Sequence, residues 1–299
     1  MNGRLFAPHE ATVSALDAGF LLGDGLFESL RADDGAAYLL DRHLARLHAA
    51  ARDLEFAEMP SPATVAEQVG RTLECAALQD AYLRITVTRG QSAAALTPPR
   101  GAPTVVIAAL PAPPRPDVAA GMAARLIGPP AERGPKAKST SRQPAVLARR
   151  KVERAGADEG IYVSKRGRVL EGTSSNVFTV REGCLITPPA EDCLPGITRG
   201  RLIELAREDG LDVREAPLTV EELLGAEQAL ATNAVQGLRA IRSIDGHPVG
   251  VDAKGGVFAH EGGVFARLLA LYEADRAAAR ANRIAAARPA AGPRRARHP

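Results

Sequence analysis

Hydrophobic positions in the first third of the chain alternate between the two-residue spacing of strands and the three- to four-residue spacing of helices. Residues 25–31 have strand character, residues 33–35 are typical of a hairpin turn, and residues 37–40 are expected to form the return strand. Apolar residues at positions 44, 47, 51 and 54 share one face of a helix, which Asp41 is expected to cap. A helix over 63–77 and strands over 82–88 and 104–110 complete this part.

The proline-rich residues 111–116 interrupt this pattern, because proline cannot continue a strand. Beyond them the pattern predicts helices over 144–156 and about 199–209, and a last helix from about 264. Strands are expected over 160–163, 169–170, 176–180, 184–186, 228–232 and 238–244. Antiparallel hairpins with helices packed outside predict an α+β fold in two domains. We place the N-terminal domain at 1–112, a linker at 113–119 and the C-terminal domain at 120–275.

The end of the chain has a different composition from the rest. The net charge is +3, yet no acidic residue follows Asp275, whereas seven arginines do: Arg276, Arg280, Arg283, Arg288, Arg294, Arg295 and Arg297. Together with the alanines and prolines there, they predict that residues 276–299 form a frayed helix that runs into disorder. A lone basic tail is weak evidence for a nucleic-acid partner, and we expect none.

The cysteines and the apolar segments narrow the class of protein further. Cys75, Cys184 and Cys193 are odd in number and lack the spacing of metal ligands, so we expect no metal site. We expect no signal peptide, and the sequence has no apolar run near 18 residues. We therefore expect a soluble, reduced, cytoplasmic protein without a membrane partner.

Lysine is scarce in this chain: only five of the 38 basic residues are lysines. Arginine replaces lysine in most surface roles but cannot form a Schiff base, so a retained lysine is a candidate for that chemistry. Lys138 is the leading candidate because of the segment that it begins, Lys138 to Ala148. A solvated surface lysine is the alternative.

Three other features suggest binding groups. Gly196-Ile197-Thr198 precedes a helix, with Thr198 placed as its N-cap, and such a helix start is either an anion site or an ordinary cap. Glu171, followed by small and polar residues, can hold a protonated ring nitrogen or lie in a solvated turn. Arg46 lies off the leucine stripe of its helix and can reach a phosphate or face water.

A lysine, a carboxylate and a phosphate clamp are the groups that pyridoxal 5′-phosphate requires. The chain resembles the fold-type IV pyridoxal-phosphate enzymes, which include D-amino-acid and branched-chain aminotransferases and aminodeoxychorismate lyase. The resemblance covers roughly residues 12 to 250. Its motifs are residues 20–28, 43–47, Lys138, 156–159, 171–178 and 194–199.

The resemblance implies a role for each of these motifs. Lys138 is the Schiff-base lysine and proton shuttle, and Glu171 pairs with the pyridine nitrogen. Arg46, Ile197 and Thr198 are implied to contact the phosphate, and Gly196 lets the phosphate approach the backbone closely. Leu194 is implied to pack on the cofactor ring, and Asn233 and Ala234 add a further phosphate contact. Lys136 is a rival for the Schiff base, but only counting from Lys138 places Val146 and Ala148 in the core of the family's helix. The resemblance also implies a homodimer, because a loop of the neighbouring subunit completes the pocket.

The substrate is harder to infer, because the chain departs from each relative. Phe27 stands where D-amino-acid aminotransferases have tyrosine, and residues 91–96 lack their Arg-x-His. Tyr82-Leu83-Arg84 matches the branched-chain enzymes, but Gln143 replaces their tyrosine, while Arg142 and residues 232–234 look more like the lyases. Candidates for binding substrate are Phe27, Arg31, Arg84, Arg89 and Arg142, and we rank Arg31 first for the carboxylate, because strand alternation puts it opposite Glu28.

Three classes of function remain open. The first is a transaminase, which moves an amino group between a D- or branched-chain type amino acid and a 2-oxo acid in ping-pong fashion. The second is an aminodeoxychorismate lyase, which releases pyruvate and 4-aminobenzoate. The third, a non-catalytic binding protein, conflicts with the intact pair of Lys138 and Glu171. We favour the transaminase, because it is the commoner activity of this fold and several arginines can accept a carboxylate.

Overall fold

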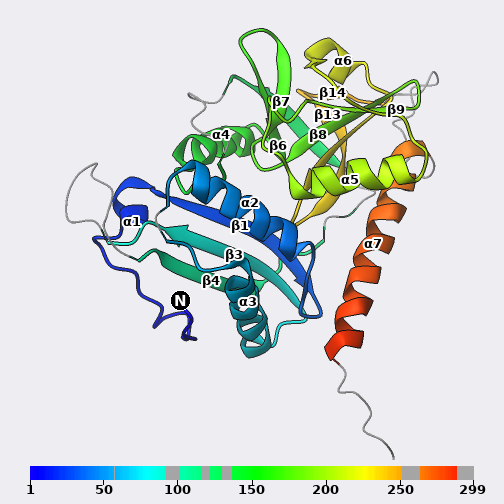
Figure 1. Ribbon diagram of the computed structural model, residues 1–299. Helices are drawn as coiled ribbons and strands as arrows, with labels where there is room; N and C mark the ends of the chain where they lie inside the picture. The colour runs from blue at the N-terminus through cyan, green and yellow to red at the C-terminus, as the bar shows by residue number, and fades with distance from the viewer. Residues whose placement is uncertain are drawn as a thin grey trace, which may run out of the picture.

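The computed structural model describes residues 1–56, 58–91, 102–115, 117, 121–129, 137–250 and 263–287, and it contains two sheets. The first is an antiparallel sheet in the order β2-β1-β3-β4. Its strands are β1 (Gly25–Asp33), β2 (Ala36–Ala37), β3 (Asp80–Thr88) and β4 (Thr104–Pro111). Helices α2 (Leu40–Asp53) and α3 (Pro62–Ala76) cover one face, and the short helix α1 (Ala18–Leu22) precedes β1 (Figure 1).

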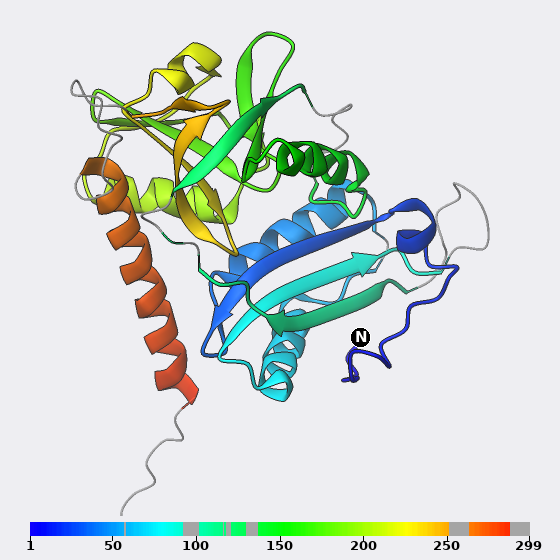
Figure 2. The same cartoon turned by 180° about the vertical axis from the view of Figure 1, so that it is seen from behind.

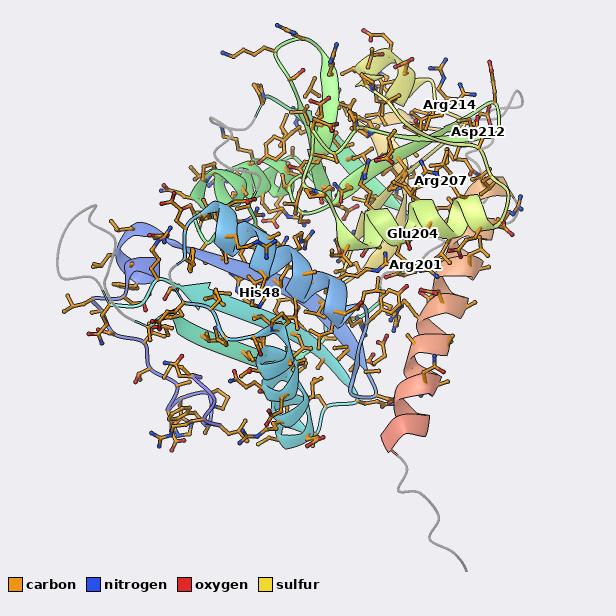
Figure 3. All side chains as sticks on the ribbon, in the orientation of Figure 1. His48, Arg201, Glu204, Arg207, Asp212 and Arg214 are labelled. Carbon is orange, nitrogen blue, oxygen red and sulfur yellow. The ribbon has the colours of Figure 1, made fainter. Side chains whose placement is uncertain are left out.

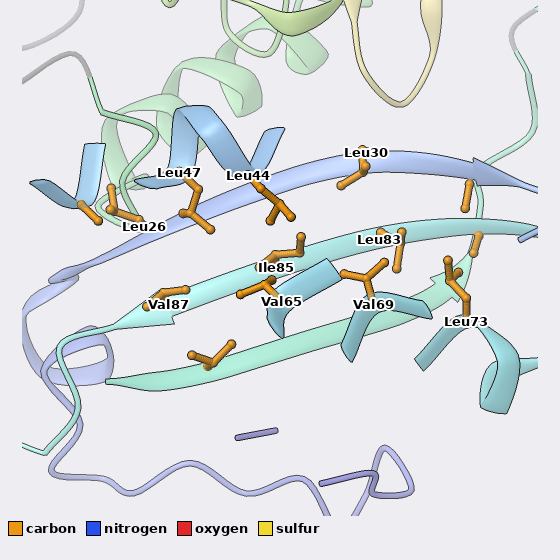
Figure 4. Close-up of a cluster of buried hydrophobic side chains, with 14 residues drawn as sticks. Leu26, Leu30, Leu44, Leu47, Val65, Val69, Leu73, Leu83, Ile85 and Val87 are labelled. Atoms are coloured by element: carbon orange, nitrogen blue, oxygen red, sulfur yellow. The ribbon is translucent and has the colours of Figure 1, made fainter. Parts of the chain in front are cut away.

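Alternation along the strands gives the first sheet one apolar face. In β3 the side chains of Leu83, Ile85 and Val87 are fully buried, whereas the intervening Tyr82 and Arg84 are only partly buried. The apolar face packs on leucines of α2 and valines of α3, which Figure 4 shows as one continuous cluster. The opposite face of this sheet carries Arg84 beside Phe27, so polar and aromatic side chains on that face can contact a ligand.

The second sheet is mixed and curled, in the order β10-β9-β8-β12-β13-β5-β6-β7-β11, with β14 paired to β13. Its strands are β5 (Met122–Ile127), β6 (Glu159–Val163), β7 (Arg168–Gly172), β8 (Asn176–Arg181), β9 (Cys184–Thr187), β10 (Val213–Glu215), β11 (Leu218–Thr219), β12 (Gln228–Asn233), β13 (Gly237–Ile244) and β14 (His247–Pro248). The helices of this half are α4 (Gln143–Arg154), α5 (Ile197–Glu208), α6 (Val220–Leu224) and α7 (Gly263–Ala287). The predicted two-domain α+β fold is confirmed.

Helix α7 leaves the second sheet and runs beside the end of the first (Figures 1 and 2). Its Arg276 is only 7% exposed and pairs with Asp33 at the end of β1, and Asp275 accepts a hydrogen bond from Tyr38. Asp275 also pairs at 2.7 Å with Arg201. Arg201 lies on α5 and is labelled in Figure 3. Residues 276–287 continue α7 as a helix, and residues 288–299 lie outside the described part of the chain, so the expectation that the tail runs into disorder stays a prediction.

Several local predictions were wrong. The return strand covers only Ala36–Ala37, because Leu39 turns the chain with a left-handed φ of 53° and is itself the N-cap of α2. Asp41 lies in the first turn instead, where its charge still suits the helix dipole. Gly196, rather than Thr198, is the N-cap of α5.

The second sheet also differs from the expected set of antiparallel hairpins. Strand β5 had no counterpart in the sequence pattern, yet it lies between β13 and β6 and pairs in parallel with both. Strand β10 pairs in parallel with β9. The proposed domain limits stay a prediction, although β4 ends at Pro111 and β5 begins at Met122. Within the described ranges, no helix has both the length and the apolar character to cross a membrane.

Candidate active site

A buried carboxylate fixes Arg46 in place. Glu28 of β1 is 1% exposed and accepts hydrogen bonds from Arg46 Nε at 2.8 Å and Arg46 Nη2 at 2.6 Å. His43 Nδ1 lies 2.7 Å from the same carboxylate. Burial alone would raise the pKa of Glu28, but the hydrogen bonds from His43 and Arg46 lower it below its usual value. The third guanidinium nitrogen of Arg46 donates to the carbonyl of Pro195 at 2.9 Å, so Arg46 lies at the start of α5 rather than in solvent.

The start of α5 leaves backbone N–H groups available to an anion. Gly196 is the N-cap, and among the described residues no side chain accepts a capping hydrogen bond there. A Cβ at Gly196 would lie 2.0 Å from Asn176 Oδ1, so only glycine fits this position. Asn176 is held in turn by a hydrogen bond from its Nδ2 to the carbonyl of Leu194 at 2.9 Å. Thr198 is buried in the first turn.

Lys138 lies beside β1, at the boundary of the two halves. Its carbonyl accepts a hydrogen bond from the N–H of Phe27 at 2.9 Å, and its Nζ lies 4.9 Å from the centre of the Phe27 ring. Burial lowers the pKa of Lys138 to about 8, with a further lowering by Arg46 and Arg142 that Glu28 and Glu171 oppose. A lysine with this pKa is neutral in about a tenth of the molecules at pH 7, far more often than an unshifted lysine, and the neutral amine is the nucleophile.

Glu171 of β7 holds the segment before α5. Its Oε2 accepts a hydrogen bond from the N–H of Leu194 at 2.8 Å, which places Leu194 next to the carboxylate. Both residues were predicted to contact a cofactor ring, and the fold brings them together.

Glu159 lies in the motif 156–159, but the sequence analysis assigned it no role. It is 3% exposed, and its carboxylate accepts hydrogen bonds from the hydroxyls of Ser174 and Ser175, each at 2.9 Å, and from the hydroxyl of Thr173. These bonds shape the loop between Glu171 and Asn176. The run of three hydroxyl residues was a signal that a buried carboxylate lies opposite.

Phe27 is surrounded by three cations. The Cζ of Arg84 lies 3.9 Å and that of Arg142 5.9 Å from the ring centre, in addition to Lys138. Arg142 Nη2 also donates to the carbonyl of Thr173 at 3.0 Å. Four of the residues predicted for catalysis or for substrate binding thus form one cluster, in which positive charge faces an aromatic ring.

Tyr162 of β6 is a second residue that was missed. It is 8% exposed, and burial raises the pKa of its phenol, an effect that Arg142 opposes and Glu171 reinforces. Arg142 and Glu171 are thus two of the four charged groups that also act on Lys138. A tyrosine within an apolar strand carries no sequence signal that separates it from a core residue.

Two predicted substrate arginines lie elsewhere. Arg31 is 5% exposed and pairs with Asp80 at 2.5 Å and with Asp33 at 3.2 Å. Arg89 pairs with Asp24 at 2.8 Å and donates to the carbonyl of Glu55 at 2.8 Å. Both guanidinium groups thus hold the N-terminal half together. Lys136 and residues 92–96 lie outside the described residues.

The turn after β12 lies close to β1. Asn233 uses its own Oδ1 to accept the N–H groups of Val235 at 3.0 Å and Gln236 at 2.8 Å. The carbonyl of Ala234 accepts the N–H of Arg31 at 3.2 Å. This turn therefore connects the second sheet to the strand that carries Phe27 and Glu28.

The groups that these residues bring together fit pyridoxal 5′-phosphate. An uncapped helix start with a glycine and a fixed arginine suits the phosphate, and a carboxylate on a neighbouring strand suits the ring nitrogen. The buried amine of Lys138 suits the aldehyde. Among the described residues, no three His, Cys, Asp or Glu side chains lie together in a group that could hold a metal ion.

Comparison with known proteins agrees with this chemistry. The chain is 35% identical over 257 residues to a putative branched-chain-amino-acid aminotransferase of Methanocaldococcus jannaschii, covering 83% of this chain and 88% of that protein. It is 32% identical to the D-alanine aminotransferase of Bacillus licheniformis, covering 85% of this chain and 90% of that protein. It is 31% identical to the aminodeoxychorismate lyase of Bacillus subtilis, covering 79% of this chain and 82% of that protein.

Solved structures share the fold. A hypothetical aminotransferase from Mycobacterium tuberculosis, in its PLP-bound form, matches with a TM-score of 0.76 at 28% identity, over 92% of this chain and 98% of that one. The likeness confirms the expected fold-type IV architecture. The family model described as amino-transferase class IV matches residues 25–244. The chain therefore belongs to the class IV aminotransferase family, whose members use pyridoxal 5′-phosphate.

Proposed function

We propose that the protein is an aminotransferase that moves an amino group between a D- or branched-chain type amino acid and a 2-oxo acid. The observation that carries the proposal is the amine of Lys138, whose pKa burial lowers to about 8. That amine lies in one cluster with Phe27, Arg84 and Arg142. Bound pyridoxal phosphate supplies an electron sink for the substrate's Cα–H bond.

Each residue of the site has a task in this proposal. Lys138 would hold the cofactor covalently, and its amine would move the proton at the substrate's Cα. Glu171 would keep the ring nitrogen protonated, and Leu194, which it holds, would pack on the ring. Arg46 and the start of α5, at Gly196, Ile197 and Thr198, would bind the phosphate, and Asn233 and Ala234 would add a further contact to it.

The substrate carboxylate is assigned to the arginines beside Phe27. Arg84 and Arg142 lie at that ring, whereas the guanidinium groups of Arg31 and Arg89 are engaged by carboxylates of the N-terminal half. We therefore rank Arg84 and Arg142 ahead of Arg31. A guanidinium binds a carboxylate in bidentate fashion, which suits this task.

One set of half-reactions tests the function. The purified enzyme with bound cofactor is mixed with single D- and L-amino acids, and the absorbance of the lysine-bound cofactor is followed. We expect this absorbance to disappear as a 2-oxo acid is released. The absorbance should return when a 2-oxo acid is added. A panel in which no amino acid produces the change would overturn the proposal.

A lyase acting on aminodeoxychorismate is the second candidate. The observation that favours it is the pair of guanidinium groups at one ring, because that substrate carries two carboxylates. The same panel includes aminodeoxychorismate. Release of pyruvate without any amino group left on the cofactor identifies the lyase and excludes the transaminase.

We also propose that the active form is a homodimer. Apolar side chains gather in α1, where Phe20 is 75%, Leu21 50% and Leu22 42% exposed. Val146 and Leu147 of α4 are also about half exposed. The two helices are linked, because Thr140 and Ser141 donate to the carbonyl of Gly23. An exposed apolar surface of this kind, next to Lys138, suits a second copy of the chain.

A further inference from the structure

Glu159, the first residue of β6, is a buried carboxylate that is bonded mainly to one loop. Its Oε1 accepts hydrogen bonds from the N–H of Gly160 at 2.9 Å, from the N–H of Thr173 at 3.1 Å and from the hydroxyl of Thr173. Its Oε2 accepts hydrogen bonds from the hydroxyls of Ser174 and Ser175, each at 2.9 Å. Burying a carboxylate costs free energy unless its oxygens are hydrogen-bonded, and here both oxygens have donors.

The loop that Glu159 holds, residues 172–175, is closely packed. The N–H of Gly172 donates to the carbonyl of Ser175 at 2.7 Å, and the N–H of Thr173 also donates to the carbonyl of Gly160 at 2.8 Å. A Cβ at Gly172 would lie 2.1 Å from Ser175 Oγ and 3.1 Å from Cδ of Glu159. The backbone of Thr173 is therefore fixed both by the neighbouring strand and by the buried carboxylate.

The carbonyl of Thr173 orients the guanidinium of Arg142. It accepts a hydrogen bond from Arg142 Nη2 at 3.0 Å, and the Cζ of Arg142 lies 5.9 Å from the centre of the Phe27 ring. Arg142 is exposed, so its long side chain would sample several rotamers without a fixed acceptor. A carbonyl is a neutral acceptor, so this contact orients the guanidinium without neutralising its charge, and a guanidinium has further N–H groups for a ligand.

An arginine of α4 lies near Glu159 but binds it less closely than the loop does. Arg149 Nη1 is 3.8 Å from Glu159 Oε1, too far for a hydrogen bond, whereas Arg149 Nε donates to Glu153 Oε1 at 2.9 Å. The side chain of Glu153 is 57% exposed. Glu153 is therefore a matched control: a carboxylate of the same arginine on the solvent side of α4.

We propose that Glu159 is a positioning residue for the substrate carboxylate: it fixes the loop of residues 172–175 so that the carbonyl of Thr173 holds the guanidinium of Arg142 beside Phe27. The proposal rests on the proposed role of Arg142 in binding that carboxylate. It assigns to the buried carboxylate of β6 a part in substrate selection, exerted through the loop and not by contact with the substrate.

The first test separates binding from chemistry. Single-turnover half-reactions of the full-length holoenzyme with the best amino acid of the panel give a dissociation constant and a limiting rate. Glu159→Gln keeps the volume of the side chain but has one acceptor oxygen in place of two, so it cannot satisfy the same donors. It should raise the dissociation constant by about 3- to 10-fold, the weight of one hydrogen bond, and leave the limiting rate nearly unchanged. Glu153→Gln should change neither value.

The second test compares two ligands that differ in the carboxylate. Pentanoate and 1-pentanol compete with the amino acid in the same half-reactions, which gives a dissociation constant for each. Glu159→Gln should weaken pentanoate by the same 3- to 10-fold and leave 1-pentanol unchanged. If Glu159→Gln does not fold, Ser174→Ala replaces it, because Ser174 is exposed and contributes one hydroxyl donor to Glu159. It should weaken pentanoate by about 2- to 3-fold.

A double-mutant cycle locates the effect. If Glu159 acts through Arg142, then Glu159→Gln in an Arg142→Ala background should weaken pentanoate no further. An unchanged constant for pentanoate, equal weakening of pentanoate and 1-pentanol, or an additive effect in the double mutant overturns the inference alone. An Arg142→Ala variant that binds pentanoate as tightly as the parent would overturn the proposed role of Arg142 as well.

Discussion

The ammonium group of Lys138 loses part of its contact with water when the chain folds, and Arg46 and Arg142 repel its charge. The same burial that makes the amine reactive therefore works against the folded apoprotein. Lys138→Met, which keeps the length but removes the charge, should abolish turnover and yet stabilise the apoprotein by about 1–2 kcal/mol at pH 7. Urea unfolding of apoprotein measures this.

The pH dependence of that gain follows from the two pKa values. Below pH 8 the lysine is charged in both the folded and the unfolded chain, so the full cost is present. The cost shrinks as pH rises through about 8, where the folded lysine loses its proton, and it is gone above the unfolded value of 10.5. An advantage of Lys138→Met that stays constant from pH 7 to pH 10 would contradict the lowered pKa.

Glu171 acts on charge rather than on shape. Glu171→Gln keeps the volume of the side chain but removes the negative charge that stabilises a protonated ring nitrogen. Because that charge matters more in the transition state than in the ground state, turnover should fall by about 10²-fold or more. Steady-state assays with the best substrate measure it. Glu153→Gln, an exposed change on α4, is the control, and near-normal turnover of Glu171→Gln would exclude the assigned role.

Helix α5 contains a matched pair of glycines with opposite expected effects. A Cβ at Gly196 would collide with Asn176 Oδ1, whereas a Cβ at Gly200, one turn later, meets no atom within 4 Å. Gly196→Ala should therefore destabilise the protein by about 1–3 kcal/mol and weaken binding of pyridoxal phosphate. Gly200→Ala should stabilise it by about 0.5–1 kcal/mol, because alanine is the better helix former. Thermal unfolding and cofactor titration of both variants check this, and equal effects would show that the helix start is not a tight cradle.

The elements with strong periodicity were predictable, and those that depend on distant partners were not. The spacing of Leu44 and Leu47 located α2, and alternation located β3, because each pattern is local. Strand β5 was missed, since its six residues include two alanines and an arginine and its pairing with β13 joins segments more than 100 residues apart. The start of α2 was misplaced because Leu39 adopts a left-handed turn that no propensity favours.

The residues of the candidate site also fall into those that the sequence predicted and those that depend on distant partners. Lys138, Glu171, Arg46 and the glycine before α5 stood out because their residue types are chemically specific. The partners of Arg31 were not predictable, since Asp80 lies 49 residues away and meets it only through the register of β1 and β3. Glu159 was hidden for a similar reason: its hydroxyl partners follow it by 14 to 16 residues.

At the scale of the whole molecule, ion pairs of α7 and α5 connect the two halves. Arg276 pairs with Asp33, and Asp275 joins Tyr38 to Arg201. Arg42 of α2 pairs with Glu204 at 2.7 Å, and Figure 3 labels Arg201 and Glu204 on α5. Lys138 and Phe27 lie where the halves meet, so their geometry depends on this connection. Charged pairs hold orientation well, although exposed ones add little stability.

The exposed apolar surface of α1 gives the last prediction. A phenylalanine that is 75% exposed in a monomer is costly unless a partner covers it, and α1 connects through Gly23 to the segment that carries Lys138. Phe20→Asp should therefore shift the protein from dimer to monomer in sedimentation velocity and lower turnover, while the secondary structure stays intact. Leu224→Asp on α6, at a leucine that is 36% exposed on a different element, should leave the dimer unchanged. A parent chain that sediments as a fully active monomer would refute the dimer, and a Phe20→Asp variant that remains dimeric would show that the interface lies on another face.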